Sequence, residues 1–235
     1  MRGARGFSLL DVLVSMAVVL VLLGIMLPSL THVRAIAQRV VCGSNMHQMY
    51  LGIVIYVGDE EDRVPGSQFL RTIRGMRPAP QEMITLHSHE NAGHPWTRWD
   101  GIGKLYDGEY LPSRGVFYCP SHTGEHTKSR YAETWSDPSL GSISGNYHYR
   151  GIGANGSMVL GDMFPASSAL LADAMRTRSD WNHVIGTNVT RVDGSVFWYQ
   201  DAEDEISERL PGDGNMPRAA ELIGDIWEML DRGPK

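Results

Sequence analysis

The chain has 235 residues and a formal net charge of −6 at neutral pH, with 42% hydrophobic and 20% charged residues. This length allows one modest globular domain beside an apolar N-terminal segment. Residues 199–235 carry ten acidic and four basic side chains, so this tail accounts for the whole excess of negative charge. The sequence shows no basic patch of the kind that nucleic-acid binding requires, and we expect no nucleic-acid partner.

An apolar stretch of membrane length follows the first six residues. Residues 7–27 would span roughly 32 Å as a helix, about the thickness of the hydrocarbon core of a bilayer. Asp11 is the one charged residue in it. A carboxylate in hydrocarbon costs about 3 kcal/mol, so such a group usually has a partner and a function. Because Arg2 and Arg5 precede the stretch, we expect a cytoplasmic N-terminus and an extracytoplasmic location for most of the chain.

The start of this stretch resembles a known processing signal. After a short leader with two arginines, the run GFSLLD (Gly6 to Asp11) is similar to the cleavage site of type IV prepilins and type II secretion pseudopilins. The resemblance implies that a membrane peptidase cuts after Gly6 and that the new N-terminal residue, Phe7, is N-methylated. It also implies that Asp11 stands where the family has glutamate, which is one methylene longer, and that Pro28 matches a frequent proline of the family.

Two other interpretations of the N-terminus stay open. One is a secretory signal peptide with Ala35 and Ala37 in an A-x-A cleavage site, although the apolar run is longer than in most such peptides and contains Asp11. The other is a plain single-span anchor, which needs neither the Gly-Phe junction nor Asp11. Under either interpretation, the residues that resemble the prepilin cleavage site would have no role in processing.

The helical pattern continues beyond the apolar stretch. Apolar residues recur at near-helical spacing as far as Val57, which predicts one long helix from about Phe7 to about Val57, bent near Pro28 where a backbone hydrogen bond is lost. The sequence therefore divides into a leader (1–6), a transmembrane helix (7–28), an amphipathic stem helix (29–58) and an extracytoplasmic head (59–235).

The head is predicted to hold a small antiparallel sheet with long loops, at residues 66–100 and 121–145. Its clearest hairpin joins residues 188–192 to 195–199 through Asp193-Gly194, a sequence typical of two-residue turns. The other expected elements are a helix at 102–110, strands at 115–119, 145–150 and 169–172, and an amphipathic helix at 217–230. Together with the long helix, they predict an α+β, pilin-like fold in which the stem packs on the sheet.

The head also resembles a family by one motif. His183, nine intervening residues and then Asp193-Gly194 match a His-x9-Asp-Gly signature of bacterial pseudopilin-like proteins. The histidine and the carboxylate could be brought together as a site. The interpretation that we favour is structural: Asp193 and Gly194 serve the turn, and His183 bonds to a backbone carbonyl.

We expect no cofactor, and calcium is the ion to consider if the head binds one, because it takes carboxylate and carbonyl oxygens. The resemblance supports this choice, since major pseudopilins use calcium to order a loop. The candidate calcium ligands are Asp173, Asp193 and Asp201, although the sequence has no contiguous calcium loop.

The cysteines and histidines could form a disulfide or a metal site. Cys42 and Cys119 could form one disulfide or remain two thiols. Cys119-x2-His122-x3-His126 also has zinc-like spacing. A histidine-rich surface loop is the simpler interpretation of that spacing. Further imidazoles nearby are His87, His89 and His94.

These observations predict a structural subunit rather than an enzyme, since the sequence has neither a phosphate-binding loop nor a nucleophile elbow. The resemblance implies a filament subunit of a type II secretion or type IV pilus-like system. Its expected partners are a prepilin peptidase/methyltransferase, other pilin-like subunits and the inner membrane. The alternatives are a membrane-tethered, monomeric extracytoplasmic binding protein and, more remotely, a zinc hydrolase.

Overall fold

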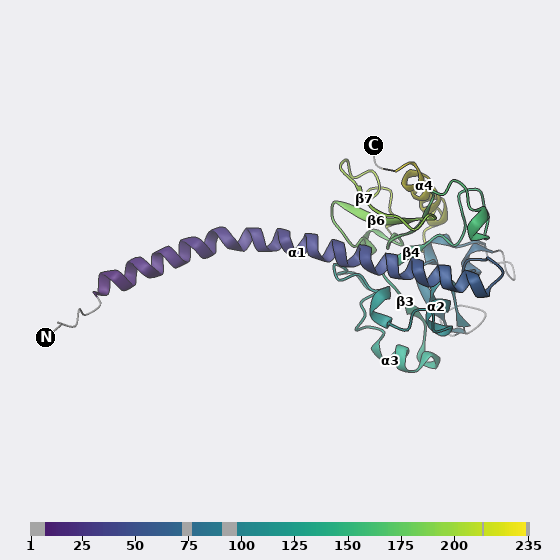
Figure 1. Ribbon diagram of the computed structural model, residues 1–235, viewed down its shortest axis with the longest axis horizontal. Helices are drawn as coiled ribbons and strands as arrows, with labels where there is room; N and C mark the ends of the chain where they lie inside the picture. Colours follow the sequence, from purple (N-terminus) through teal and green to yellow (C-terminus); the bar gives the residue numbers. More distant parts are fainter. Residues whose placement is uncertain (1–7, 72–76, 91–97, 213, 234–235) are drawn as a thin grey trace. The chain divides into compact units, whose positions relative to one another are not determined.

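The structure is a computed structural model that describes residues 8–71, 77–90, 98–212 and 214–233. As predicted, the fold class is α+β: one long helix, α1 (Leu9–Asp59), is followed by antiparallel sheets of three and four strands. The chain divides into two compact units, residues 1–38 and 39–235, and α1 contributes to both (Figure 1). Gly6 and Phe7, the predicted processing site, lie outside the described residues.

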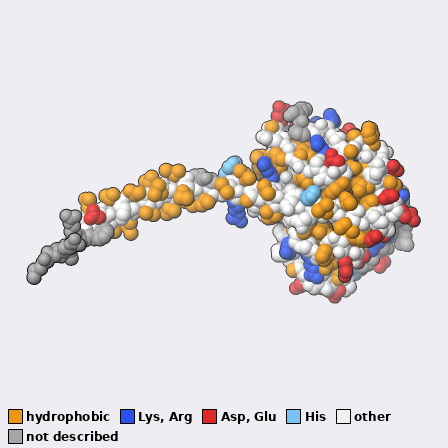
Figure 2. All heavy atoms as spheres, viewed as in Figure 1, with side chains coloured by type: hydrophobic (Ala, Val, Ile, Leu, Met, Phe, Trp, Pro, Cys, Tyr) orange, Lys and Arg blue, Asp and Glu red, His pale blue; other side chains and the backbone are white. Residues whose placement is uncertain are grey.

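The first unit is an exposed apolar helix. All its large apolar side chains described from Leu9 to Ile36 are exposed, and Figure 2 shows hydrophobic side chains along the visible face of this part of the chain. An 18-residue window of α1 has a mean hydropathy of 2.7 and no buried residue. By length and composition, α1 is therefore a candidate membrane span. It runs unbroken through position 28, and Figure 1 shows it curving gently in its N-terminal half.

The C-terminal part of α1 belongs to the second unit and packs on the head. Its buried apolar residues are three or four positions apart, so they lie on one side of the helix. Each is at most 7% exposed: Cys42, Met46, Met49, Ile53 and Val57. Burying side chains of this size contributes about 2 kcal/mol each. This is the packing of stem on head that the sequence predicts.

The larger sheet is fully antiparallel, in the order β4-β5-β6-β7. Its strands are β4 (Tyr147–Tyr149), β5 (Ala169–Asp173), β6 (Gly186–Arg191) and β7 (Val196–Gln200). All five residues of β5 are buried. The predicted strands at 145–150 and 169–172 and the predicted hairpin are therefore confirmed. Only the turn differs, because Arg191 N donates to Ser195 O and leaves three residues, not two, in the loop.

The loop between β6 and β7 packs against α1 through Gly194. This glycine has φ +84°, and a Cβ at its position would lie 2.4 Å from Cε1 of Tyr50. The Tyr50 hydroxyl donates a hydrogen bond to Val192 O at 2.8 Å, which fixes the ring against the loop. The turn therefore needs glycine for both its backbone conformation and its contact with the helix.

We predict that Gly194→Ala lowers the free energy of unfolding by on the order of 3 kcal/mol, from the left-handed backbone and from the displaced Tyr50 ring. Gly156 separates the two effects, because its φ is +80° but a Cβ added there would meet no atom within 4 Å. Gly156→Ala should cost only about 1 kcal/mol. Denaturant unfolding followed by tryptophan fluorescence measures both, and equal losses in the two variants would contradict the contact with Tyr50.

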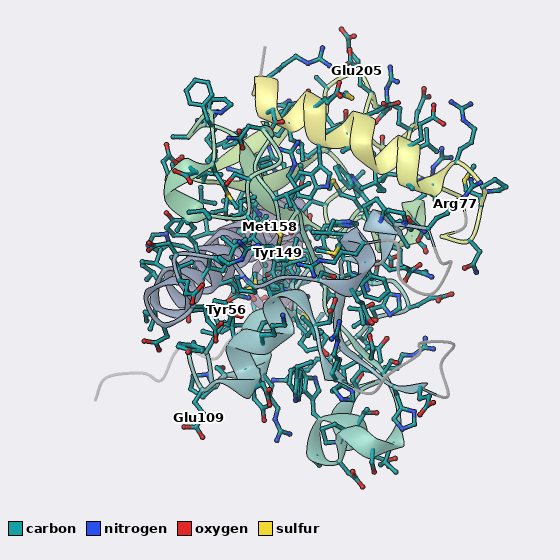
Figure 3. All side chains as sticks on the ribbon, turned by 90° about the vertical axis from the view of Figure 1, so that its right-hand side faces the viewer. Tyr56, Arg77, Glu109, Tyr149, Met158 and Glu205 are labelled. Atoms are coloured by element: carbon teal, nitrogen blue, oxygen red, sulfur yellow. A yellow bond between two sulfur atoms is a disulfide. The ribbon has the colours of Figure 1, made fainter. Side chains whose placement is uncertain are left out.

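Helix α4 (Ala219–Arg232) covers a second core and confirms the predicted amphipathic helix. Its buried residues are Ala219, Ile223, Ile226, Trp227 and Leu230. The last four of these form a cluster with Ala169 and Ala172 of β5 and Val189 of β6. Arg150 pairs with Asp231 at 2.7 Å and joins the end of α4 to the sheet. Figure 3 shows α4 along one side of the head, with Tyr149 inside and Glu109 pointing away from it.

The smaller sheet takes two short strands from residues 66–100, a segment predicted as mostly loop. Its order is β2-β1-β3, with β1 (Thr85–Ser88), β2 (Arg98–Trp99) and β3 (Ile143–Ser144). All four residues of β1 are buried although three of them are polar. The strand therefore lacks the alternation that marks strands in a sequence. One of its polar side chains, His87, is buried by packing against the Trp99 ring, with the two ring centroids 5.0 Å apart.

The predicted strand at 115–119 is wrong. Residues Arg114–Phe117 form a 3-10 helix, in which Val116 N donates to Ser113 O at 3.2 Å and Tyr118 N donates to Gly115 O at 3.2 Å. The apolar residues there are buried by packing in the core and not by sheet pairing.

Two short helices also differ from the prediction. The helix predicted at 102–110 is shorter: it is α2 (Lys104–Asp107), preceded by a 3-10 turn. A further helix, α3 (Ala132–Ser136), lies in a segment predicted as irregular.

Candidate functional site around the Cys42–Cys119 disulfide

Cys42 and Cys119 form a disulfide, one of the two states that the sequence leaves open. The two Cα atoms are 5.3 Å apart and 77 positions separate the residues. Cys42 comes from α1, and Cys119 follows the 3-10 helix of residues 114–117. Both cysteines are buried, at 0% and 4% exposure. The bridge therefore ties α1 covalently to the head at a buried point.

A histidine and a carboxylate lie beside the disulfide. Asp173 is the last residue of β5, and His183 lies in the loop before β6. His183 Nε2 is 3.6 Å from Cys119 Sγ and 3.6 Å from Asp173 Oδ2. The ligand atoms of Cys42, Cys119, Asp173 and His183 all lie within 4.8 Å of one another. We call these four residues the junction cluster.

Hydrogen bonds fix the carboxylate of the junction cluster. Asp173 Oδ2 accepts from Asn188 N at 2.7 Å, and its Oδ1 accepts from Asn182 Nδ2 at 3.1 Å. Burial raises the pKa of Asp173, while His183 and these hydrogen bonds oppose the rise. Burial lowers the pKa of His183, with Asp173 opposing the fall. Both shifts favour the uncharged forms, as expected for two groups removed from water.

The surroundings of the cluster include α1. Asn188 Nδ2 donates to the carbonyl oxygen of Arg39 at 3.3 Å. The Arg39 guanidinium lies over the ring of Trp198, 4.6 Å from its centroid, and this ring meets His183 edge-on at 5.5 Å. Arg39 also lowers the pKa of His183 by charge repulsion. The helix, the hairpin and the loop of His183 thus enclose one buried polar centre.

The structure does not bring His183 and Asp193 together as a site. Asp193 lies in the β6–β7 loop, where its Oδ1 accepts from Ser195 N at 2.9 Å. The structural interpretation of Asp193 and Gly194 is confirmed. The expected bond from His183 to a backbone carbonyl is not among its contacts, because His183 faces Cys119 and Asp173 instead.

The candidate calcium ligands lie in separate hydrogen-bond sets. Asp201 accepts from Ile206 N at 3.0 Å and from Ser207 N at 2.9 Å, and Asp193 serves its own loop. Asp173 belongs to the junction cluster. Within the described residues, the one group of three or more metal-binding side chains in mutual reach is that cluster, so the three aspartates form no shared site there.

The zinc-like spacing after Cys119 also gives no site. His122 Nδ1 lies 2.8 Å from Asn182 Oδ1, and His126 Nδ1 lies 2.6 Å from the Tyr131 hydroxyl. Both imidazoles therefore serve hydrogen bonds within the head. His87 lies 3.2 Å from Gly141 O. His94 lies outside the described residues.

Asp11 lies in the first turn of α1. Its Oδ2 accepts from Ser8 N at 3.1 Å, and Ser8 Oγ accepts from Leu10 N at 3.3 Å. This reciprocal arrangement is a capping box, which satisfies two backbone donors at the start of a helix. Sequence reasoning missed this role, although the Ser-x-x-Asp spacing indicates it. The side chain of Asp11 is exposed.

A buried histidine elsewhere in the head makes its stability dependent on pH. His148 on β4 is fully buried, its Nε2 lies 2.7 Å from Pro80 O, and its ring packs edge-on against Trp227. Burial lowers the pKa of His148 to about 4. Its folded-state pKa is thus below its unfolded value, so folding releases the proton, and stability falls as the pH drops below about 6.5.

We predict that this one group removes about 2 kcal/mol from the free energy of unfolding between pH 7 and pH 5. Urea unfolding of the full chain in detergent at both pH values measures the loss. His148→Gln should reduce the difference between the two values, whereas His47→Gln, at an exposed position of α1, should leave it unchanged. The same pH dependence in His148→Gln would show that other groups cause it.

Comparison of the chain with protein-family models, with curated proteins and with solved structures finds no significant match.

Proposed function

We propose that the chain is a pilin-like subunit of a type II secretion or type IV pilus-like filament, processed after Gly6 and N-methylated at Phe7. One observation carries the proposal: a single helix, α1, is apolar and exposed in its first thirty or so positions, and buries one face against the head from Cys42 onward. A helix of this kind suits both a membrane and a bundle of identical helices.

The N-terminal half of α1 would hold the protein in the inner membrane, with Arg2 and Arg5 on the cytoplasmic side and the head outside. A prepilin peptidase would then remove residues 1–6. After extraction from the membrane, the apolar helices of successive subunits would pack together. A head-to-tail contact that does not close into a ring generates a helical filament.

Asp11 would pair with the α-amino group of Phe7 in the neighbouring subunit. Burying both charges together offsets the cost of burying either one alone, and it sets the axial register. Aspartate reaches one methylene less far than the family's glutamate. The capping hydrogen bond from Ser8 N to Asp11 Oδ2 places the carboxylate at the N-terminal end of the helix, where such a partner would arrive.

The disulfide supports this function mechanically. Extraction and assembly pull on α1, and the Cys42–Cys119 bridge joins that helix covalently to the head. Disulfides persist in extracytoplasmic compartments, where the head would lie. The mechanism is packing rather than catalysis.

A second candidate function is a membrane-tethered, monomeric binding protein. It is favoured by an open cavity of about 530 Å³ lined by Arg114, Lys128, Ser129, Ala132 and Trp135. Two cations beside an indole ring suit an anionic ligand with apolar parts.

Mechanical shearing of native cells separates the two functions. A filament subunit should appear in the sheared fraction, and an antibody against the head should label filaments along their length in electron micrographs. Recovery of the protein only as a detergent-extracted monomer from membranes would favour the binding protein.

A further inference from the structure

We propose that the junction cluster is a Zn²⁺ site when its disulfide is reduced, with Cys42 and Cys119 as thiolates, His183 through Nε2 and Asp173 through one carboxylate oxygen. The cluster would then have two states, disulfide and zinc, and each would join α1 to the head. This inference is independent of the proposed function.

The four side chains match the ligand chemistry of zinc. Structural zinc sites are tetrahedral and take sulfur, imidazole nitrogen and carboxylate oxygen. The thiolates favour zinc over calcium or magnesium. The ligand atoms already lie within 4.8 Å of one another. At Zn–S distances of about 2.3 Å, tetrahedral geometry needs the sulfurs about 3.8 Å apart. Reduction of the S–S bond allows this separation by side-chain rotation.

The environment already orients two of the ligands. Asn188 N and Asn182 Nδ2 hold the Asp173 carboxylate from both oxygens, as outer hydrogen bonds commonly do at metal sites. His183 directs Nε2 at Cys119 Sγ, and its burial favours the neutral imidazole that binds metals. Zinc with two thiolates and one carboxylate would have a net charge of −1. Arg39, which repels a charged His183, is the cation placed to balance it.

Interconversion of the two states needs an external reductant and an external oxidant. A phosphine reductant with water converts the disulfide to two thiols and is itself oxidised to the phosphine oxide. Zn²⁺ then displaces the two thiol protons, together with the carboxyl proton of Asp173 wherever that group is uncharged, and these protons pass to solvent. Oxidation of the two thiolates by a small disulfide oxidant forms the protein disulfide and releases the metal; the oxidant is reduced to two thiolates, which take protons from solvent.

The test uses the full chain in detergent, with Co²⁺ as a spectroscopic probe and Zn²⁺ measured by elemental analysis after gel filtration. The reduced chain should bind about one equivalent and show the thiolate-to-cobalt charge-transfer bands and intense visible bands of tetrahedral Co²⁺. The oxidised chain should bind none. His183→Gln should weaken binding at least about tenfold. His47→Gln, at an exposed position of α1 outside the cluster, should not change it.

Two outcomes would overturn the proposal. The first is a reduced chain without thiolate-to-cobalt bands. The second is equal affinity in wild type and His183→Gln, which would mean that the thiols alone bind the metal. Circular dichroism decides the case in which reduction unfolds the head. Refolding on addition of Zn²⁺ would support a metal-coupled junction, and continued unfolding at saturating Zn²⁺ would overturn it.

Discussion

Asp11→Ala is expected to abolish assembly into filaments while leaving the protein in the membrane. In the proposed filament, the Asp11 carboxylate neutralises the α-amino group of the adjacent Phe7. Its loss leaves that ammonium unpaired in an apolar bundle, at a cost of about 3–5 kcal/mol per contact. This corresponds to a loss of roughly two to four orders of magnitude in the association constant of each contact, and the sheared fraction should contain no detectable protein.

Two control variants separate charge from helix capping. Asp11 also accepts from Ser8 N, so Asp11→Ala removes a capping bond. Ser8→Ala removes the reciprocal bond to Leu10 N but keeps the carboxylate, and it should still assemble. Asp11→Glu restores the residue of the resembled family and should assemble at least as well as wild type. Wild-type amounts of filament in Asp11→Ala would contradict the pairing and leave a simple anchor.

Removal of the disulfide is expected to cause the largest loss of stability. The bridge closes a loop between residues 77 positions apart, for which chain entropy gives a stabilisation on the order of 4 kcal/mol. The double variant Cys42→Ala/Cys119→Ala leaves no free thiol and should lose about this much free energy of unfolding. All six tryptophans lie beyond residue 95, so their fluorescence during urea unfolding reports on the head.

Reduction of the wild-type chain serves as the internal control for this prediction. In the presence of a chelator, a phosphine reductant should move the wild-type midpoint close to that of the double variant. The midpoint of the double variant should not respond to the reductant. An unchanged wild-type midpoint after complete reduction would show that the bridge does not stabilise the head.

The elements that the sequence predicts well are those with a local signal. The long helix shows in its apolar run and in the periodic spacing up to Val57, and α4 shows in its apolar face. The β6–β7 hairpin shows in Asp193-Gly194 between runs of β-branched and aromatic residues. The smaller sheet lacks such a signal, because β1 buries polar residues such as Thr85 and His87 through pairing with distant segments.

The junction cluster could be predicted only in its parts. The cysteines indicate a bridge as one of two states, and Asp173 is noticeable as a carboxylate that ends an apolar strand. Its proximity to His183 depends on the register of β5 and β6 and on the course of the loop between them. Sequence spacing instead suggests Asp193 as the partner of His183, because a motif shows which residues recur together and not which side chains face each other.

The N-terminus and intact mass of the protein from its native host test the central claim most directly. Prepilin processing predicts a chain that begins at Phe7 and carries one additional methyl group on its α-amino nitrogen. A chain that begins at Met1 would indicate a plain membrane anchor. A chain that begins after Ala37 would indicate a secreted protein without the apolar helix, and either of these results would contradict the filament account.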